Sequence, residues 1–377
     1  MHTPCINEYQ LYQSIRRNQA FWSRQLEDYP LLWITVPRAK KGRDLPEPEN
    51  EQEMWTDIDY FIAYSENTLS RTYFAGDALP VCHPWLGPDQ FAAWLGAEIT
   101  LKPKEFTSWV KPFVNDWSDY PVLKIDPNNP WWKLYIETVR ASAQAGQDKW
   151  ITAYPDLHSG IDGLCAIRGP ENLMLDMVAE PDTIHRHMAE MTELWKWVVD
   201  QVTAIIAPYG QGSGNWTGGW SRDRFLCIGQ NDFSCLISPP MFREFCLEDN
   251  VQCCGYVDQT LYHLDGPDAL RHLPLILDLK KLNCVQWIQG AGHPLPSRWL
   301  DLLQQIQAAG KTVQLFYAGS HGGDADLFEE MEVLCKNLDP CRLFFNIQVD
   351  RVEKADALVR HTQKICRSAG KNQYSKS

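Results

Sequence analysis

Short apolar runs alternate with longer amphipathic stretches along most of this chain. Short runs of this kind predict strands, and stretches in which apolar residues recur every three or four positions predict helices. The predicted strands are 149–155, 211–218, 225–230, 259–264, 283–288, 311–317 and 342–348. The predicted helices are 131–146, 170–180, 182–208, 238–254, 267–278, 296–309 and 324–338. Ser238, which two prolines follow, is the expected N-cap of helix 238–254.

The apolar segment 72–82 brings the number of predicted strands to eight. Strands that alternate with helices favour a parallel sheet, and eight such units predict an α/β fold with a single (β/α)8 TIM barrel. Before this region lie an amphipathic stretch (8–28), an apolar run (31–36), a charged loop (37–52) and a further helix (53–70). We therefore expect residues 1–70 to form an N-terminal helical extension, packed on a barrel of residues 71–370.

The composition narrows the class of protein. The net charge of −13 argues against a nucleic-acid partner, because such proteins need a basic surface. No apolar run reaches the length of a membrane span, and the first residues lack the basic and apolar segments of a signal peptide. The 12 cysteines have no framework spacing, so we expect reduced thiols in a cytoplasmic protein that is not associated with a membrane.

The strand predicted at 259–264 carries the strongest chemical signal. His263 and Asp265 are two positions apart, so an extended strand directs both side chains to the same face, directly before the turn at Gly266-Pro267. Polar groups at the carboxyl ends of strands are how (β/α)8 barrels build active sites. We expect His263 and Asp265 to lie in an enzyme pocket and to perform acid–base catalysis.

Two further catalytic candidates follow other strands. His158 lies between Asp156 and Asp162, and two acids beside an imidazole can raise its pKa and fix its tautomer. Asp77 lies in an apolar run, where a buried carboxylate needs a partner. A structural role for Asp77 in a turn remains an equal alternative to a catalytic one.

The expected substrate-binding residues are polar or aromatic groups near the ends of the later strands. The glycine-rich segment 212–220 contributes two tryptophans, and its glycines would let a ligand approach the backbone closely. The complete set is Trp216, Trp220, Gln230, Gln286, Trp287, Tyr317, His321 and Asn346.

Several segments match known proteins in their order and spacing. They are Gly76-Asp-Ala-Leu-Pro, Phe91-Ala-Ala-Trp-Leu-Gly-Ala-Glu, Gly163–Pro170, Asp232–Phe245 and His263–Ala269. Together they resemble the uroporphyrinogen decarboxylase superfamily, which includes corrinoid-linked methyltransferases. The resemblance implies the (β/α)8 fold and an enzyme, with Asp77 at the position of the family's key aspartate.

The methyltransferase branch of this superfamily holds zinc through a His-x-Cys pair and a late cysteine. Here His263 matches the first ligand, whereas Asp265 and Asn346 occupy the two cysteine positions. Asp232 or His321 could supply a third ligand. The resemblance thus implies a methyltransferase-like enzyme that demethylates a small organic substrate, with zinc as the candidate metal and a corrinoid carried by a partner protein.

Two other functions are also compatible with the sequence. The segment Ser14–Trp22 does not reproduce the arginine motif of true uroporphyrinogen decarboxylases, but a cofactor-free decarboxylase or other lyase could act on a different carboxylated substrate. That function predicts Arg168 or Arg222 in the pocket. A non-catalytic ligand-binding homologue predicts polar groups that satisfy one another and leave no open pocket. A homodimer is a further expectation.

Overall fold

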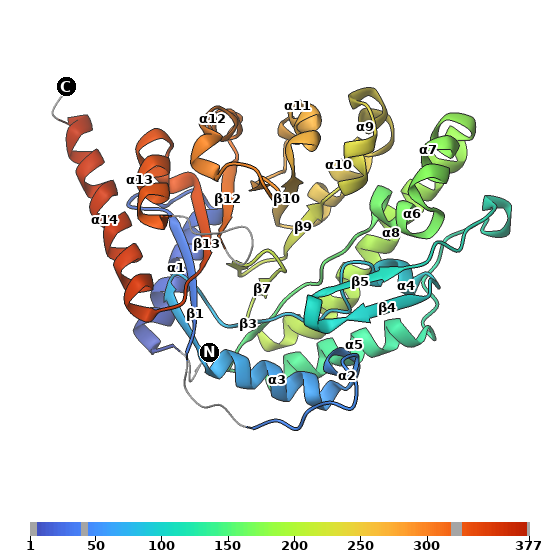
Figure 1. Cartoon of the computed structure of the whole chain (residues 1–377), viewed down its shortest axis with the longest axis horizontal. Helices are drawn as coiled ribbons and strands as arrows, with labels where there is room; N and C mark the ends of the chain where they lie inside the picture. Colours follow the sequence, from blue (N-terminus) through green and yellow to red (C-terminus); the bar gives the residue numbers. More distant parts are fainter. Residues whose placement is uncertain (1–5, 39–43, 318–325, 375–377) are drawn as a thin grey trace.

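The computed structural model describes residues 6–38, 44–317 and 326–374 of the chain. Its centre is a seven-stranded sheet whose strands lie in the order β2-β1-β13-β12-β11-β10-β9 (Figure 1). All neighbours in this sheet are parallel except β2, which runs antiparallel to β1. The bounds are β2 (Thr72–Gly76), β1 (Leu31–Pro37), β13 (Leu343–Gln348), β12 (Thr312–Tyr317), β11 (Cys284–Ile288), β10 (Gln259–Asp265) and β9 (Phe225–Gly229).

Three short pairs accompany the large sheet. β3 (Val81–Cys82) is parallel to β6 (Ile151–Thr152), and a parallel bridge from Ala153 to Gly214 links this pair to β7 (Ser213–Gly214). β7 is antiparallel to β8 (Trp220–Ser221), and β4 (Ile99–Lys102) forms a hairpin with β5 (Thr107–Val110).

Fourteen α-helices lie in the part of the chain that the structure describes, and most of them surround the sheet (Figure 1). Several short 3-10 helices join them to the strands. The α-helices are α1 (Glu8–Trp22), α2 (Glu53–Thr56), α3 (Ile58–Ser70), α4 (Gln90–Trp94), α5 (Pro130–Ala145), α6 (Gly160–Arg168), α7 (Pro170–Ala179), α8 (Pro181–Ile206), α9 (Pro239–Phe245), α10 (Leu247–Tyr256), α11 (Leu273–Leu277), α12 (Leu300–Ala308), α13 (Leu327–Asn337) and α14 (Val352–Tyr374).

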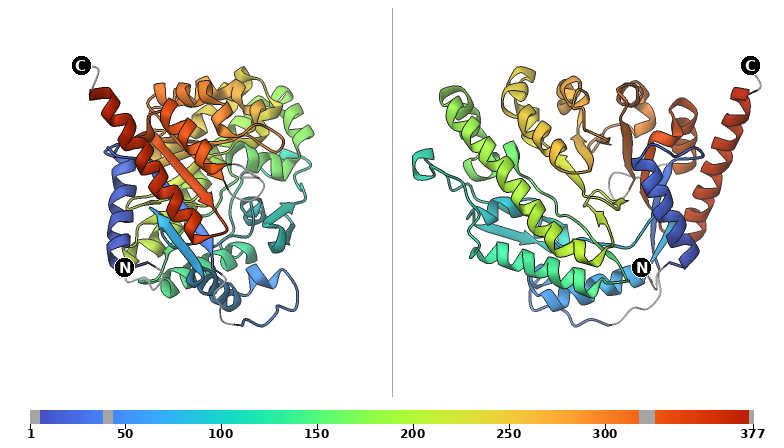
Figure 2. Two further views of the ribbon diagram at one scale, coloured as in Figure 1. Left: turned by 60° about the vertical axis from the view of Figure 1, so that its left-hand side comes forward. Right: turned by 180° about the vertical axis from the view of Figure 1, so that it is seen from behind.

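The two faces of the sheet belong to two separate cores, because alternate residues of a strand point to opposite sides. On β10, for example, Tyr262 and Leu264 join the large outer core beneath the helices, whereas Leu261 belongs to a smaller inner core. Helix α1 covers the inner core, and the ring centroids of Trp22 and Phe225 are 4.4 Å apart. Figure 2 shows α1 from behind, on the side that faces away from the viewer in Figure 1.

This inner core is layered along the strand direction. Leu31, Phe225, Leu261, Cys284 and Phe344 come from the beginnings of their strands and form an apolar layer against α1. The inward-facing residues closer to the carboxyl ends of the later strands are mainly polar. Because α1 closes the apolar end, polar chemistry is confined to the carboxyl ends.

The sequence predicted most of these elements. The predicted strands after 224 and the long helices agree with the structure to within a few residues, and Ser238 caps α9 by accepting a hydrogen bond from the Met241 amide. The α/β fold with a mostly parallel sheet is therefore confirmed. Among the described residues, no hydrogen-bonded ladder joins β2 to β3 or β7 to β9, so the strands do not make one continuous cylinder of ladders.

The N-terminal region, for which the sequence predicted an extension packed on a barrel, contributes a strand to the large sheet. β1 comes from residues 1–70, yet it is an interior strand between β2 and β13. The predicted strand 72–82 is also split, because β2 ends at Gly76, whose φ is +63°. The chain then passes through Asp77 to the separate strand β3.

Two chain-wide expectations can be compared with the structure. No helix in the described ranges combines the length and apolar character that crossing a membrane would require. Every cysteine that the structure describes is a free thiol, as the scattered spacing predicted.

Candidate functional site

A row of hydrogen-bonded side chains crosses three neighbouring strands on the inner face of the sheet. His263, Gln286 and Gln314 are successive partners in the registers of β10, β11 and β12. Gln314 donates from Nε2 to the Thr217 carbonyl at 3.1 Å, and Gln286 donates from Nε2 to Oε1 of Gln314 at 2.7 Å. The last contact joins Nδ1 of His263 to Oε1 of Gln286 at 2.5 Å.

The Thr217 carbonyl fixes the direction of every hydrogen bond in this row. A carbonyl can only accept, so each glutamine must donate from its amide nitrogen and accept at its oxygen. The Oε1 atom of Gln286 therefore accepts from His263, and Nδ1 of the imidazole carries a proton. In the neutral ring this leaves the lone pair on Nε2, the atom that can take up or release a proton.

One carboxylate and one aromatic ring border this imidazole, and a second carboxylate interacts with it through its charge. Nε2 of His263 lies 3.9 Å from Oδ2 of Asp265, which confirms that these two side chains share one side of the strand end. The ring of Trp216 meets the imidazole edge to face, with 5.1 Å between the centroids. Burial raises the pKa of Asp156, and the imidazoles of His158 and His263 both act on it in the opposite direction. His263 and His158 thus lie within electrostatic reach of the same carboxylate.

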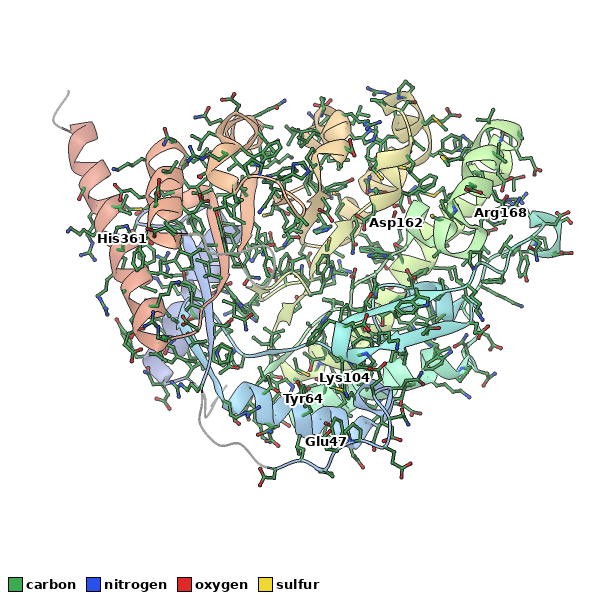
Figure 3. The ribbon with its side chains drawn as sticks, viewed as in Figure 1. Glu47, Tyr64, Lys104, Asp162, Arg168 and His361 are labelled. Carbon is green, nitrogen blue, oxygen red and sulfur yellow. The ribbon has the colours of Figure 1, made fainter. Side chains whose placement is uncertain are left out.

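His158 is the centre of a second polar cluster. Its Nε2 lies 3.8 Å from Oδ2 of Asp156, and its Nδ1 lies 3.9 Å from Oδ1 of Asp89. Gln230 donates a hydrogen bond from Nε2 to Oδ1 of Asp156. Asp162, which Figure 3 labels on α6, accepts from the Phe233 amide at 2.9 Å. Asp156 thus lies beside His158, and Asp162 acts on this imidazole through its charge.

The charges of this cluster determine the protonation of the imidazole. Burial by itself lowers the pKa of His158, but Asp156, Asp162, Asp232 and Asp89 together outweigh burial and raise the pKa to about 9. Burial and the neighbouring carboxylate of Asp232 raise the pKa of Asp162. His158 is consequently a cation at neutral pH.

This charge state predicts a dependence of stability on pH. Because the pKa of His158 in the folded state lies above the ordinary value of 6.5, the stabilisation is complete below pH 6.5 and is lost as the pH rises through about 9. We expect urea denaturation to show a loss of about 2–3 kcal/mol over this range.

The His158→Gln variant should have a much flatter dependence of its unfolding free energy between pH 7 and pH 9. His185→Gln is the matched control, since the His185 side chain is 42% exposed and its ion pair with Glu244 lies on the surface. Equal pH slopes for the wild type and His158→Gln would contradict the assigned charge.

A cavity of about 270 Å³ opens beside the polar row. Trp216 lines this cavity and also contacts His263, which does not itself line the cavity, so the Trp216 ring lies between the two parts of the site. β13 contributes Asn346 and Gln348, and the wall is completed by residues that include Trp33, Thr35, Asn215 and His83. A volume of this size suits a small organic molecule and is too small for a tetrapyrrole.

The glycine-rich segment lines the cavity at Gly218, and its glycines also have a packing role that the sequence did not predict. A Cβ atom on Gly218 would lie 2.5 Å from Nδ2 of Asn346, and one on Gly219 would lie 2.9 Å from the ring of Phe344. Both glycines also have positive φ angles, +84° and +97°. The glycines therefore let this loop approach β13, where Asn346 donates to the Thr217 carbonyl at 2.8 Å.

Asp77 is placed apart from the residues around His263. Its Oδ1 accepts from Nε of Arg17 at 2.8 Å, and its Oδ2 accepts from the Leu32 amide at 2.8 Å. Burial raises the pKa of Asp77 to about 6, against the opposing effects of Arg17 and the Leu32 amide. These contacts favour the structural alternative for Asp77, and we do not retain it in the site.

Three aromatic candidates also lie outside the cavity wall. Gln286 and Trp287 are adjacent on β11 and so face opposite sides; Trp287 packs in the outer core against Trp299. Tyr317 also lies in the outer core, where its hydroxyl donates to Glu330 at 3.0 Å. Trp220 is in the inner core and donates from Nε1 to the Gln211 carbonyl. His321 lies outside the described residues.

The described residues do not make up a zinc site. Zinc in proteins takes three or four protein ligands, and no group of three or more His, Cys, Asp or Glu residues in the described part of the chain is arranged to hold a metal. His263 and Asp265 form only a pair, and Asp232 does not complete it. We therefore assign no reaction step to a metal.

The arginines that a decarboxylase would need are elsewhere. Arg168 pairs with Asp176 at 2.6 Å and donates to the Val114 and Asn115 carbonyls, at the periphery seen in Figure 3. Arg222 is exposed. The open cavity, in turn, does not match the closed arrangement that a non-catalytic homologue predicts.

Sequence reasoning missed Gln314, Asp89 and the Thr217 carbonyl. Gln314 had a usable signal, because it is a polar residue at the centre of an apolar predicted strand. Asp89 and Thr217 lie in loops, where spacing along the sequence does not indicate which side chains meet.

Several solved structures are similar to this chain. A methyltransferase from Methanosarcina mazei has a similar structure, with a TM-score of 0.60 and 12% sequence identity. The superposition covers 93% of this chain and 98% of that chain. No family model and no curated protein matches the sequence. At this identity the similarity shows a shared fold.

Proposed function

We propose that this protein is a methyltransferase-like enzyme that demethylates a small organic molecule. The observation that carries the proposal is the fixed orientation of His263, whose Nδ1 is committed to Gln286 and whose Nε2 is left for proton exchange. The methyltransferase fold of the Methanosarcina mazei protein supports the reaction class. In this proposal the sheet and the short strand pairs act together as the (β/α)8 barrel.

The reaction begins with the substrate in the cavity of about 270 Å³, with its methylated heteroatom extended past the edge of Trp216, the lining residue whose ring contacts His263. The bond between the methyl carbon and the heteroatom breaks, and its electron pair stays on the heteroatom. Protonated His263 then gives the proton on Nε2 to this heteroatom. Asp265, at 3.9 Å from Nε2, and Asp156 place negative charge beside the imidazolium that precedes this transfer.

The methyl group needs a nucleophile as its acceptor. A corrinoid carried by a partner protein would supply this nucleophile at the mouth of the site. The cavity volume decides where such a group can be, because a corrin ring does not fit into about 270 Å³. The cavity therefore holds the substrate alone, and the partner approaches from outside.

The test is an anaerobic assay with cob(I)alamin and a panel of methylated alcohols, ethers, amines and thiols. We expect the absorption spectrum of methylcobalamin to appear with at least one class of substrate, at a rate that depends on the amount of protein. The reverse assay starts from methylcobalamin and the demethylated compounds. If neither direction exceeds the protein-free rate with folded protein, the proposed reaction is wrong.

A further inference from the structure

A second cavity, of about 250 Å³, lies next to the one described above. We name it the aromatic chamber and define it by Trp55, Phe61, Tyr64, His83, Trp85 and Phe106. Helices α2 and α3 form one wall, and the turn between β4 and β5 forms another; Figure 3 labels Tyr64 and Lys104 on these two elements. The chamber shares Leu69, Val81 and His83 with the first cavity, so the two are adjacent.

The rings of the chamber suit a flat apolar ligand. Trp55 and Trp85 are tilted toward each other with 5.4 Å between their centroids, and Trp85 lies 5.2 Å from the ring of His83. Aromatic rings at such separations attract further rings through stacked or edge-to-face contacts. Tyr64 and Phe106 lie at the rim and are 39% and 69% exposed, which leaves an apolar entrance.

His83 is a polar residue of the chamber wall. Its Nε2 is shielded from solvent and has no hydrogen-bond partner among the described residues. Burial lowers the pKa of His83 to about 4, so the ring is neutral, and the backbone of Tyr154 acts in the opposite direction as a hydrogen-bond acceptor. The ring therefore donates from Nδ1, and Nε2 keeps a buried lone pair that lacks a donor.

Phe106 has an unfavourable backbone conformation at the entrance. Its φ is +53°, in the left-handed region that a bulky residue rarely adopts and that glycine or asparagine adopts readily. The side chain is also exposed. A large apolar residue at this position is therefore not explained by the stability of the turn, whereas contact with a ligand would explain it.

We propose that the aromatic chamber binds a small aromatic molecule, or the aryl part of a larger one, and that the His83 imidazole shifts on binding, so that Nε2, which is shielded in the empty chamber, accepts a hydrogen bond from an O–H or N–H group of the ligand. The ring of the ligand packs against Trp55, Trp85 and Phe106. This assignment does not depend on methyl transfer, since it rests on the chamber alone.

The test uses 4-fluorophenol, which has the required donor, and 4-fluoroanisole, which lacks it, with fluorine NMR as the readout. We expect saturable binding of 4-fluorophenol to the wild-type protein. His83→Leu should weaken the binding of 4-fluorophenol by about tenfold and should change the binding of 4-fluoroanisole little, because only the phenol donates to the buried acceptor. Tyr9→Ala, an exposed aromatic site on α1, is the control and should bind like the wild type.

Two more variants separate binding from folding. Ser65→Trp places a large side chain in the chamber and should abolish binding of both probes. Phe106→Gly should raise the melting temperature, because glycine adopts a positive φ without strain. The same variant should still weaken the binding of both probes. The proposal is overturned if 4-fluorophenol does not bind saturably, if Ser65→Trp binds it as well as the wild type, or if His83→Leu affects both probes equally.

Discussion

Replacement of Arg17 by methionine should lower the free energy of unfolding by about 3–5 kcal/mol. Arg17 and Asp77 are buried partners, with side chains that are 8% and 2% exposed. Removal of the cation leaves the Asp77 carboxylate in the protein interior with only the Leu32 amide as a described partner. An uncompensated buried charge is among the most destabilising changes that a single substitution can cause.

The contacts of Arg17 explain why its replacement should lower the free energy of unfolding so strongly. Its other nitrogens donate to Asp28 at 2.6 Å and to the Tyr29 and Pro30 carbonyls, and its guanidinium lies 3.6 Å from the centroid of the Tyr29 ring. These groups directly precede β1, whereas Asp77 directly follows β2. A single side chain therefore connects α1 with the two strands at this edge of the sheet.

The predicted loss should depend on pH in a defined direction. Burial raises the pKa of Asp77 to about 6 even with Arg17 present, and without the cation the carboxyl can become neutral more easily. A raised folded-state pKa favours the folded protein as the pH falls. The deficit of Arg17→Met measured by urea denaturation should therefore be smaller at pH 5 than at pH 8.

A second substitution provides the control. Arg17→Met combined with Asp77→Asn removes the carboxylate together with the guanidinium. This double variant should recover part of the stability that Arg17→Met loses. Lys111→Met is the matched surface control, because the Lys111–Glu98 pair is exposed on both sides and should contribute little. A loss below about 1 kcal/mol for Arg17→Met, or one that is the same at both pH values, would contradict the buried ion pair.

Replacement of His263 by alanine should have the largest effect on activity. We expect kcat/KM to fall by about 10²- to 10⁴-fold, the usual contribution of a proton-transferring side chain, while the unfolding transition remains cooperative. The measurement uses the substrate that the cobalamin assay identifies. His185→Ala, on the surface of α8, is the matched control and should retain full activity.

Gln286 should act as a positioning residue for this imidazole. Gln286→Leu removes the acceptor of the Nδ1 proton and frees the tautomer, so the activity should fall less than in His263→Ala and its pH profile should shift. Nitrogen NMR of the imidazole provides a readout independent of turnover. The wild type should show the proton of neutral His263 on Nδ1, and a proton on Nε2 would refute the assigned orientation.

Local patterns were sufficient to predict most of the strands and the residues that flank them. The apolar runs at 259–264 and 283–288 correspond to β10 and β11, and the two-residue spacing brought His263 and Asp265 to one side. By the same rule, Gln286 and Trp287 cannot both be substrate-binding residues, since adjacent residues on a strand face opposite sides. Tyr317 faces the outer core for a related reason. It lies three positions after Gln314, which faces inward, and an odd spacing along a strand puts two residues on opposite faces.

Contacts between distant parts of the chain could not be read from the sequence. β1 pairs with β13, which lies about 300 residues later, and nothing in an apolar run identifies its partner. Arg17 meets Asp77 only after α1 has packed against the sheet. The direction of the hydrogen bonds around His263 depends on a loop carbonyl, and a backbone group leaves no trace in the residue pattern.

The row of glutamines has a consequence for how protons reach and leave His263. Amide side chains do not ionise, so the Gln286–Gln314 row holds the imidazole in place but cannot carry its charge away through the sheet. Nε2 lies beside Asp265, whose side chain is 46% exposed, so a hydrogen ion exchanged there reaches solvent at the end of the strand and not through the sheet. The imidazole should then regain its proton while the organic molecule is still bound, and solvent isotope exchange at Nε2 that bound product does not slow would reveal it.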